Sequence, residues 1–345
     1  MHYRTLLTPF LLTALHATAQ IPPAVSHVSF LNAATIRLQK PSPSPLPSPP
    51  PTITGFSHFE VLDERVDTGR IGIHTCIPDF GRNHDRQLVF GHSAAAEIAG
   101  YLNQRFTQPQ SPYTALVILR TLWLSDAAYP RAELRRNPER RLERTHIRLK
   151  AEIYAIRDGH YIPLLRFDTL QIALKKRILS ERSPYYEWGQ NLSLLMDNLA
   201  DSARRLTQEK EDDNRWVDLA DIRQFNDSRF YAPIGDTEPA RGVYANFEEF
   251  RNNTPSIQDF EIKTENHERL LYIRESGTAY YSHEAWGYCD GKTIYIMRDG
   301  VLYPACKEGK AFYIPTGAAT GGPLTISHDY KRRIFFIDMD TGDIY

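Results

Sequence analysis

The chain has 345 residues, of which 41% are hydrophobic and 24% are charged, proportions typical of soluble globular proteins. At roughly 100–200 residues per domain, this length indicates about two domains. The 41 basic and 42 acidic residues give a net charge of −1. The protein as a whole therefore lacks the positive charge that attracts proteins to nucleic acids, and we expect no nucleic-acid partner.

The first nineteen residues have the pattern of a secretory signal peptide. Arg4 supplies a basic start, Thr5–Ala14 is an apolar run too short to span a membrane, and Ala17-Thr18-Ala19 matches a cleavage site. We expect cleavage after Ala19 and export to the periplasm or the extracellular space. No cysteine lies near this junction, so a lipid anchor is not expected. No later stretch reaches 18 consecutive apolar residues, so we expect no membrane span.

A proline-rich run, PSPSPLPSPPP, occupies residues 41–51. Such a run adopts extended polyproline II, so we interpret residues 20–54 as a spacer. A ligand for a proline-binding groove is the alternative, but it needs a cytosolic partner that an exported protein rarely meets.

Residues 55–206 predict a domain with a sheet packed by helices on one face. Its expected strands are Arg70–Ile77, Tyr113–Leu124, Ile147–Ile156 and Tyr161–Leu170, the last two joined by an Asp158-Gly159 hairpin. Tyr113–Leu124 is apolar on both alternations, which predicts a strand covered on both sides. A helix capped by Ser93 runs to Phe106, and a second spans about Tyr185–Leu206.

Asp168 is the candidate catalytic residue of this domain. A two-residue hairpin loop would place it opposite Leu149, and Arg166 opposite Ala151, on the apolar face, where unpaired charge is costly. Pro163 can instead introduce a bulge that reverses the face. In that interpretation, which we favour, Asp168 and Arg166 are an exposed pair.

Residues 131–150 carry eight basic and three acidic side chains. A solvated loop is the favoured interpretation, and docking of an anionic glycan, a lipid headgroup or an acidic protein is the functional one. The basic residues that would do so are Arg135, Arg136, Arg140 and Arg141.

No metal site or cofactor is expected. The side chains of His74, Cys76, His84 and His92 are suitable for zinc, but they lack the close ligand pairs of structural zinc sites. Motifs of serine hydrolases, zinc proteases, nucleotide-binding P-loops and dinucleotide-binding folds are absent from the sequence.

An acidic linker with an embedded helix, residues 207–229, leads to a β-rich domain at 230–345, and the overall fold class is α+β. Asn246 is expected to cap a helical turn that ends before Pro255. Turn dipeptides at Asp290-Gly291, Asp299-Gly300 and Glu308-Gly309 then predict an antiparallel meander.

Two-residue loops in this meander pair Arg298 with Val301 and Lys307 with Lys310. One face then carries Ile294, Ile296, Tyr303, Ala305, Phe312 and Ile314. The other face carries apolar groups too, so the meander is either covered twice or exposes an aromatic surface to a partner. In the second case Tyr295 and Tyr313 are the candidate binding residues.

Two further patterns concern single residues. Asp338-x-Asp340-x-Gly342-Asp343 is interpreted as a turn, because a calcium loop of the EF-hand type needs a glutamate at its twelfth position. Cys289 and Cys306 fall about 13 Å apart and on opposite faces of the predicted meander, too far for a disulfide. With Cys76 in the other domain, we expect three free, buried thiols.

The stretches VYANFEEFRNNTPSI and AWGYCDGKTIYIMRDGVLYPACKEGKAFYIP resemble a group of uncharacterised secreted proteins of Bacteroidota. That pattern pairs a Y-x-x-F-E-E-F-x-x-N-x-P-S helix with a W-G-[YF]-C-D-G-K strand, and it covers about the last hundred residues. The resemblance implies lineage and export, and it assigns no activity and no functional residues.

The sequence supports two functions of different classes. The leading hypothesis is an exported, non-enzymatic module of the envelope that binds another protein or an anionic glycan. It rests on the export signal, the spacer, the basic segment and the two-sided meander. The alternative is an extracellular hydrolase that uses Asp168 and further carboxylates, for which no nucleophile or metal set is visible.

Overall fold

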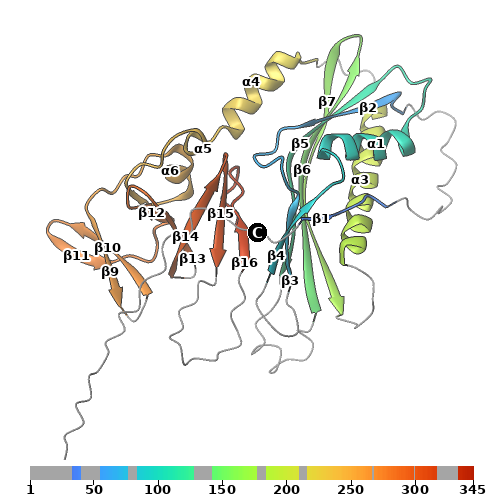
Figure 1. Cartoon of the computed structure of the whole chain (residues 1–345). Helices are drawn as coiled ribbons and strands as arrows, with labels where there is room; N and C mark the ends of the chain where they lie inside the picture. Colours follow the sequence, from blue (N-terminus) through green and yellow to red (C-terminus); the bar gives the residue numbers. More distant parts are fainter. Residues whose placement is uncertain are drawn as a thin grey trace, which may run out of the picture.

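The structure is a computed structural model that describes residues 33–39, 55–76, 84–127, 142–176, 184–209, 216–265, 268–298, 300–316 and 333–345. The expected signal peptide and the proline-rich run lie outside these residues. Strands and helices combine into an α+β fold, as predicted. Figure 1 shows two parts, which we call the N-terminal part (33–209) and the C-terminal part (231–345), with helix α4 extending between them.

A seven-stranded sheet forms the N-terminal part, with the order β1-β4-β3-β5-β6-β7 and with β2 paired to β5. β1 falls inside the expected spacer, where it pairs in parallel with β4 as an edge strand. The spacer prediction was therefore wrong for this segment. The strands are β1 (Ala33–Thr35), β2 (His58–Asp63), β3 (Gly72–Cys76), β4 (His84–Val89), β5 (Thr114–Ala127), β6 (Leu142–Arg157) and β7 (His160–Lys176).

Two helices cover one face of this sheet, as the sequence predicted. α1 (Ala94–Phe106) begins after Ser93, whose hydroxyl accepts a hydrogen bond from the Ala96 amide at 3.2 Å. α3 (Pro184–Glu209) buries Trp188 and the leucines that follow it at helical spacing. No helix within the described part of the chain is long and apolar enough to cross a membrane.

The opposite face of the sheet is also covered, which accounts for the apolar residues on both alternations of β5. α4 (Leu219–Phe230) lies within the segment expected as an acidic linker, and it is the helix embedded there. Its Ile222 packs against Leu116, Ile118 and Tyr154 of the sheet. The linker therefore contributes to the core of the N-terminal part.

The C-terminal part contains two antiparallel sheets. α6 (Phe247–Asn252) has the predicted cap, since the Asn246 side chain accepts from the Glu249 amide at 2.9 Å. A six-stranded sheet follows the order β16-β15-β14-β13-β12-β8, and a three-stranded sheet the order β11-β10-β9. The remaining elements are α5 (Pro233–Asp236), β8 (Gly242–Tyr244), β9 (Phe260–Glu265), β10 (Glu268–Glu275), β11 (Thr278–Tyr281), β12 (Gly287–Cys289), β13 (Ile294–Arg298), β14 (Val301–Glu308), β15 (Ala311–Thr316) and β16 (Arg333–Phe336).

The meander is present, with one change of register. Arg298 pairs with Val301 as predicted, but Lys307 pairs with Phe312 and not with Lys310. The second turn closes at Glu308–Ala311, two positions from the expected register. Because side chains alternate with a period of two, this shift leaves every residue on its predicted face. Ile294, Ile296, Ala305, Phe312 and Ile314 do share one core.

The other face of the meander is also buried, in two separate places. Tyr295 stacks on Tyr288 beneath the three-stranded sheet, and Tyr313 packs with Trp123 of the N-terminal part. The two tyrosines are 4% and 0% exposed, so neither offers an aromatic surface to a partner. The binding role considered for them is not available to buried side chains. Their role is in the two interfaces that hold the meander.

Cys289 and Cys306 form no disulfide within the described residues and are buried in different hydrophobic clusters, in line with their predicted opposite faces. Burial raises the pKa of the Cys289 thiol, which reduces its thiolate fraction and its reactivity at neutral pH. We expect both thiols to resist alkylation in the native protein. Thiol counting after denaturation without reductant should give three groups, Cys76 included, and a count of one would contradict the assignment.

Candidate functional site

A break in the edge of β5 creates the space for a site. β2 pairs in parallel with the first half of β5, and β3 pairs with its far end, at Leu124 and Ser125. Between these pairings the chain leaves the sheet after Asp63 and returns at Gly72. The loop 64–71 therefore stands out from the sheet edge, toward the C-terminal part.

A β-bulge at Arg120 lies opposite this loop. Leu119 pairs with Ala151 and Thr121 with Lys150, so Arg120 is an extra residue in β5. A bulge changes the direction of side chains locally, which brings Arg120 and Thr121 to the same face of the sheet as Trp123. The guanidinium of Arg120 donates to Glu64 on the loop and lies over the Phe230 ring at 4.6 Å. The bulge thus ties the sheet to both the loop and α4.

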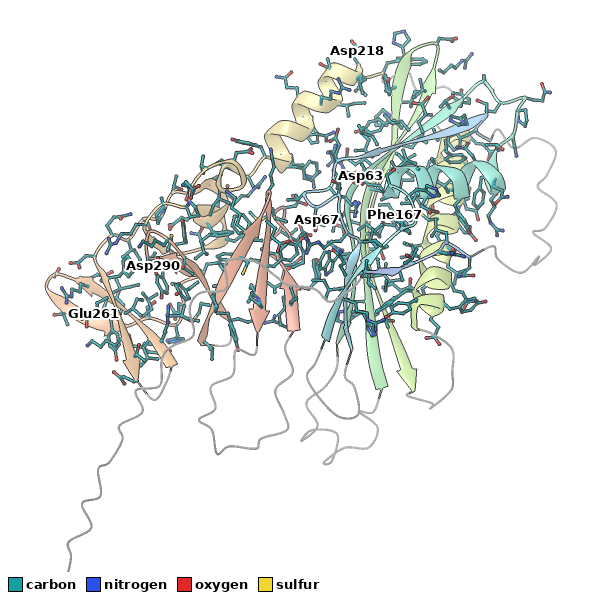
Figure 2. The ribbon with its side chains drawn as sticks, in the orientation of Figure 1. Asp63, Asp67, Phe167, Asp218, Glu261 and Asp290 are labelled. Carbon is teal, nitrogen blue, oxygen red and sulfur yellow. The ribbon has the colours of Figure 1, made fainter. Side chains whose placement is uncertain are left out.

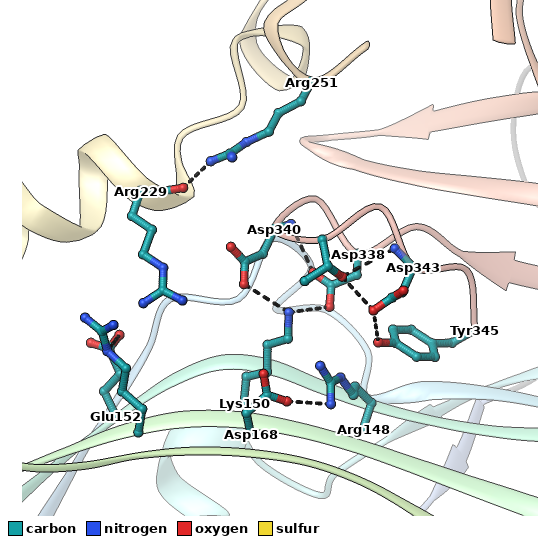
Figure 3. A network of polar contacts seen from close by, with 12 residues as sticks. Arg148, Lys150, Glu152, Asp168, Arg229, Arg251, Asp338, Asp340, Asp343 and Tyr345 are labelled. Atoms are coloured by element: carbon teal, nitrogen blue, oxygen red, sulfur yellow. Dashed lines mark hydrogen bonds and ion pairs between the residues drawn. The ribbon is translucent and has the colours of Figure 1, made fainter. Parts of the chain in front are cut away.

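Charged side chains on β6 are buried on the face of the sheet opposite α1 and α3. Arg148, Lys150 and Glu152 alternate with the apolar residues that face the helices, as predicted, but all three are less than 10% exposed. Buried charges are costly unless paired. Figure 3 shows the pairing: the Lys150 ammonium lies between Asp338 and Asp340, with Nζ–O distances of 2.8 and 3.0 Å.

The two aspartates belong to the turn that the sequence indicated. The Gly342 amide donates to the Asp338 carbonyl at 2.7 Å, and the Asp338 amide donates to the Asp343 carbonyl at 2.8 Å. Their side chains bind a lysine 190 residues away from Asp340 in sequence. The turn interpretation is confirmed, and the partner of its carboxylates is an ammonium group of the other part.

A cavity of about 280 Å³ lies between the two parts, bounded by these elements. In Figure 2, Asp67 on the loop lies where the two parts meet, whereas Glu261 and Asp290 lie farther into the C-terminal part. The walls come from the loop, β5, β6, α4, α5, the β14–β15 turn and the segment after β16. The lining residues are Glu64, Arg65, Val66, Asp67, Arg120, Thr121, Leu122, Trp123, Lys150, Asn226, Phe230, Tyr231, Ala232, Gly235, Asp236, Lys310, Phe336, Asp338, Met339 and Asp340.

All the carboxylates in this wall have cationic partners. Glu64 is paired with Arg120, Asp67 with Arg70 at 2.8 Å, and Asp236 with Lys310 at 2.9 Å. Asp338 and Asp340 share Lys150. The lining residues include no serine, cysteine or histidine. Only the pairs of Lys150 with Asp338 and Asp340 join the two parts, and the other three pairs each lie within one part.

Three residues of the wall carry buried polar atoms that have neither a hydrogen bond nor an ion pair among the described residues. Asn226, on α4, is 2% exposed, and both atoms of its carboxamide are unpartnered. The Trp123 indole nitrogen and Arg120 Nε are the other two. Buried polar groups are normally hydrogen-bonded, so these atoms are exceptions within the wall.

The sequence did not identify most of these residues. Asp168 does not line the cavity, and its carboxylate is paired with Arg148 at 2.5 Å and is 55% exposed. A bulge between Ile153 and Tyr154 moves Asp168 opposite Lys150, which is the interpretation favoured from Pro163. Arg135, Arg136, Arg140 and Arg141 lie outside the described residues. The sequence signals for this site were the charged residues on β6 and the aspartate-rich turn. Only folding brings these two segments together.

Residues suited to metal binding do not gather here. Among the residues that the structure describes, no group of three or more histidine, cysteine, aspartate or glutamate side chains could hold a metal ion. The side chains of Cys76 and His84 are outside that description.

Tyr313 should make stability sensitive to alkaline pH. Its ring is fully buried and its hydroxyl donates to Asp67, and burial raises the pKa of Tyr313 well above its usual value. The unfolded chain releases this proton at pH about 10 and the folded chain retains it, so stability falls as pH rises above 10. In urea unfolding between pH 10 and 12, the free energy of unfolding of the wild type should fall more steeply with pH than that of Tyr313→Phe. The expected difference is up to about 1.4 kcal/mol per pH unit. Parallel losses in the two proteins would contradict this.

The chain shows little similarity to known proteins. No protein family model matches the chain, and no curated protein matches it. A solved structure from Xanthomonas campestris, of the family designated DUF330, is similar at 11% sequence identity and a TM-score of 0.30. That match covers 53% of this chain and 99% of the other. A likeness this slight supports no inference about function.

Proposed function

We propose that the protein is an exported, non-enzymatic binding module whose ligand site is the cavity between its two parts. The observation that carries this proposal is the cavity of about 280 Å³ at the junction of the two parts, whose lining includes the buried residue Asn226. Ligand sites form preferentially where two structural units meet, and a few placed polar groups give them specificity.

The pairing of the cavity's carboxylates with arginine and lysine favours a binding function over hydrolysis. A hydrolase that uses two carboxylates needs one as an acid and one as a base or nucleophile. The carboxylates of the cavity wall are instead paired with arginine or lysine, and Asp168 lies outside the wall. Carboxylates paired in this way are not free to act as the acid and the base of a hydrolase.

Export and an envelope partner remain part of the proposal. They rest on the signal-peptide pattern of residues 1–19, the proline-rich run at 41–51 and the basic residues within 131–141. A polyproline spacer of eleven residues spans on the order of 30 Å and would hold the folded part away from its N-terminus. A pull-down from envelope extract with the mature chain tests that partner. It should recover one specific envelope protein, and replacing Arg135, Arg136, Arg140 and Arg141 by serine should abolish that recovery.

Filling the cavity tests the binding function. The low-molecular-mass fraction of an envelope extract should raise the unfolding temperature of the wild type, since a ligand that binds the folded state stabilises it. Ala232→Phe places a ring in the cavity wall and should remove that rise. Ala279→Phe makes the same change on the exposed strand β11 and should keep it. An equal rise in both variants, or no rise in the wild type, would overturn the proposal.

A further inference from the structure

The outer edge of β7 is open over most of its length. β7 is the last strand in the order of the seven-stranded sheet, and it pairs with β6 along its whole length. On its other side, the described residues supply only the bridge between Tyr161 and Val217. Pro163 and the bulge beside it protect the same first part of the strand, because proline offers no amide and a bulge interrupts pairing. Among the described residues, none of these protections reaches 165–176.

Exposed apolar side chains mark the open part of this edge. Leu165 and Phe167 pack into the core that α1 and α3 cover, so alternation places Leu170 and Ile172 on the opposite face. Leu170 and Ile172 are 41% and 49% exposed. A long, open edge strand with exposed apolar residues is a template for pairing with another strand. The edge therefore indicates a partner that supplies a strand.

The sequence of β7 is complementary to itself. A two-fold axis perpendicular to the sheet makes two copies of the strand antiparallel and pairs only residues of the same face, so each register is centred on one residue. Every second residue from Asp168 onward gives the series Asp168, Leu170, Ile172, Leu174 and Lys176. A register centred on Ile172 places the acidic end of this series opposite the basic end of the other copy. The three apolar positions then lie opposite one another.

Other registers of the same symmetry fit less well. A centre at Gln171 places Arg166 opposite Lys176, and like charges directly opposite each other are destabilising. A centre at Phe167 places Arg166 opposite Asp168, but the bulge near the start of β7 confines that pairing to a much shorter segment. Charge complementarity and length together favour the centre at Ile172.

We propose that β7 pairs antiparallel with β7 of a second copy of this chain, centred on Ile172, and joins the two seven-stranded sheets into one. The Asp168 carboxylate can serve this contact. It is paired with Arg148 at 2.5 Å but is 55% exposed, and a carboxylate accepts from more than one donor. Because each copy contributes one short segment, the dimer should be weak and its population should depend on concentration. This inference is independent of the cavity.

Single cysteines test the register of the dimer. In Ile172→Cys the two copies of residue 172 are directly opposite, with Cα atoms about 4.5–5.5 Å apart, a distance that a disulfide spans. In Leu170→Cys, on the same face of the same strand, the two cysteines are four positions apart along the strands, roughly 13 Å. With oxidised glutathione, Ile172→Cys should form a disulfide-linked dimer, and Leu170→Cys and the wild type should not. Equal cross-linking of the two variants, or none in Ile172→Cys, would overturn the proposal.

Sedimentation at increasing protein concentration tests the association itself. The wild type should change from monomer to dimer, and Asp168→Lys, which creates two like-charge pairs, should weaken the association about tenfold or more. Adding Lys176→Asp to that variant restores opposite charges and should restore the dimer.

Ile172→Lys should also weaken the association, because it places two lysines opposite each other at the centre of the contact. Leu194→Lys makes the same change on α3, at a residue that is 54% exposed, and should leave the association unchanged. A monomer at every concentration would mean that a second copy does not occupy the edge. That result, or an assembly that grows beyond a dimer, would overturn the proposal.

Discussion

Lys150→Met should destabilise the protein by about 3–5 kcal/mol, because it leaves the buried carboxylate of Asp338 and the partly buried one of Asp340 together without a cation. Lys150 Nζ lies 2.8 Å from Asp338 and 3.0 Å from Asp340, and the side chains of Lys150 and Asp338 are 6% and 3% exposed. No other cation is paired with these two carboxylates in the described part of the chain. Urea unfolding followed by tryptophan fluorescence at neutral pH measures the loss.

Two further variants identify the cause of that loss. Lys310→Met removes the partner of Asp236, but this pair is 62% and 37% exposed, so the cost should be about 0–1 kcal/mol. The triple variant Lys150→Met, Asp338→Asn, Asp340→Asn removes the uncompensated charge and should recover most of the stability. Equal losses for Lys150→Met and Lys310→Met would contradict the assignment of Lys150 as the cation that joins the two parts.

Gly72→Ala should destabilise the protein by about 2–6 kcal/mol, since overpacking costs about 1–3 kcal/mol and a strained backbone conformation adds a similar amount. A Cβ at Gly72 would lie 2.0 Å from the Leu124 carbonyl oxygen, and φ is +156°. This contact is where β3 meets β5 beside the loop that lines the cavity, so the change should also weaken the cavity wall.

Gly100→Ala is the matched control for that change. Gly100 lies inside α1, and a Cβ there meets no atom within 4 Å. Alanine is favoured over glycine in a helix interior by about 0.5–1 kcal/mol, so this variant should be more stable than the wild type. Opposite signs for the two substitutions are the expected result. A destabilised Gly100→Ala with an unchanged Gly72→Ala would show that the approach of β3 to β5 is wrong.

The strongest sequence predictions depended on short-range patterns, and these determined the elements. Ser93 and Asn246 cap α1 and α6, and Asp158-Gly159 turns β6 into β7, because each motif satisfies its own backbone within a few residues. The alternation along β6 placed its charged and apolar faces correctly. The meander kept its faces despite a register error of two positions, since a strand repeats its side-chain direction every two residues.

What the sequence by itself determined was therefore the α+β fold class, most of the regular elements and the faces that they bury. The tertiary structure decided the candidate site. The bulge at Arg120, the gap between β2 and β3, and the contact between Lys150 and Asp340 join segments that are up to 190 residues apart. Alternation marks a side chain as pointing away from one core, but it does not say whether water or another part of the chain covers it. The buried charges of β6 were accordingly placed on the correct face, and only packing against the C-terminal part made one of them, Lys150, part of the wall of a cavity.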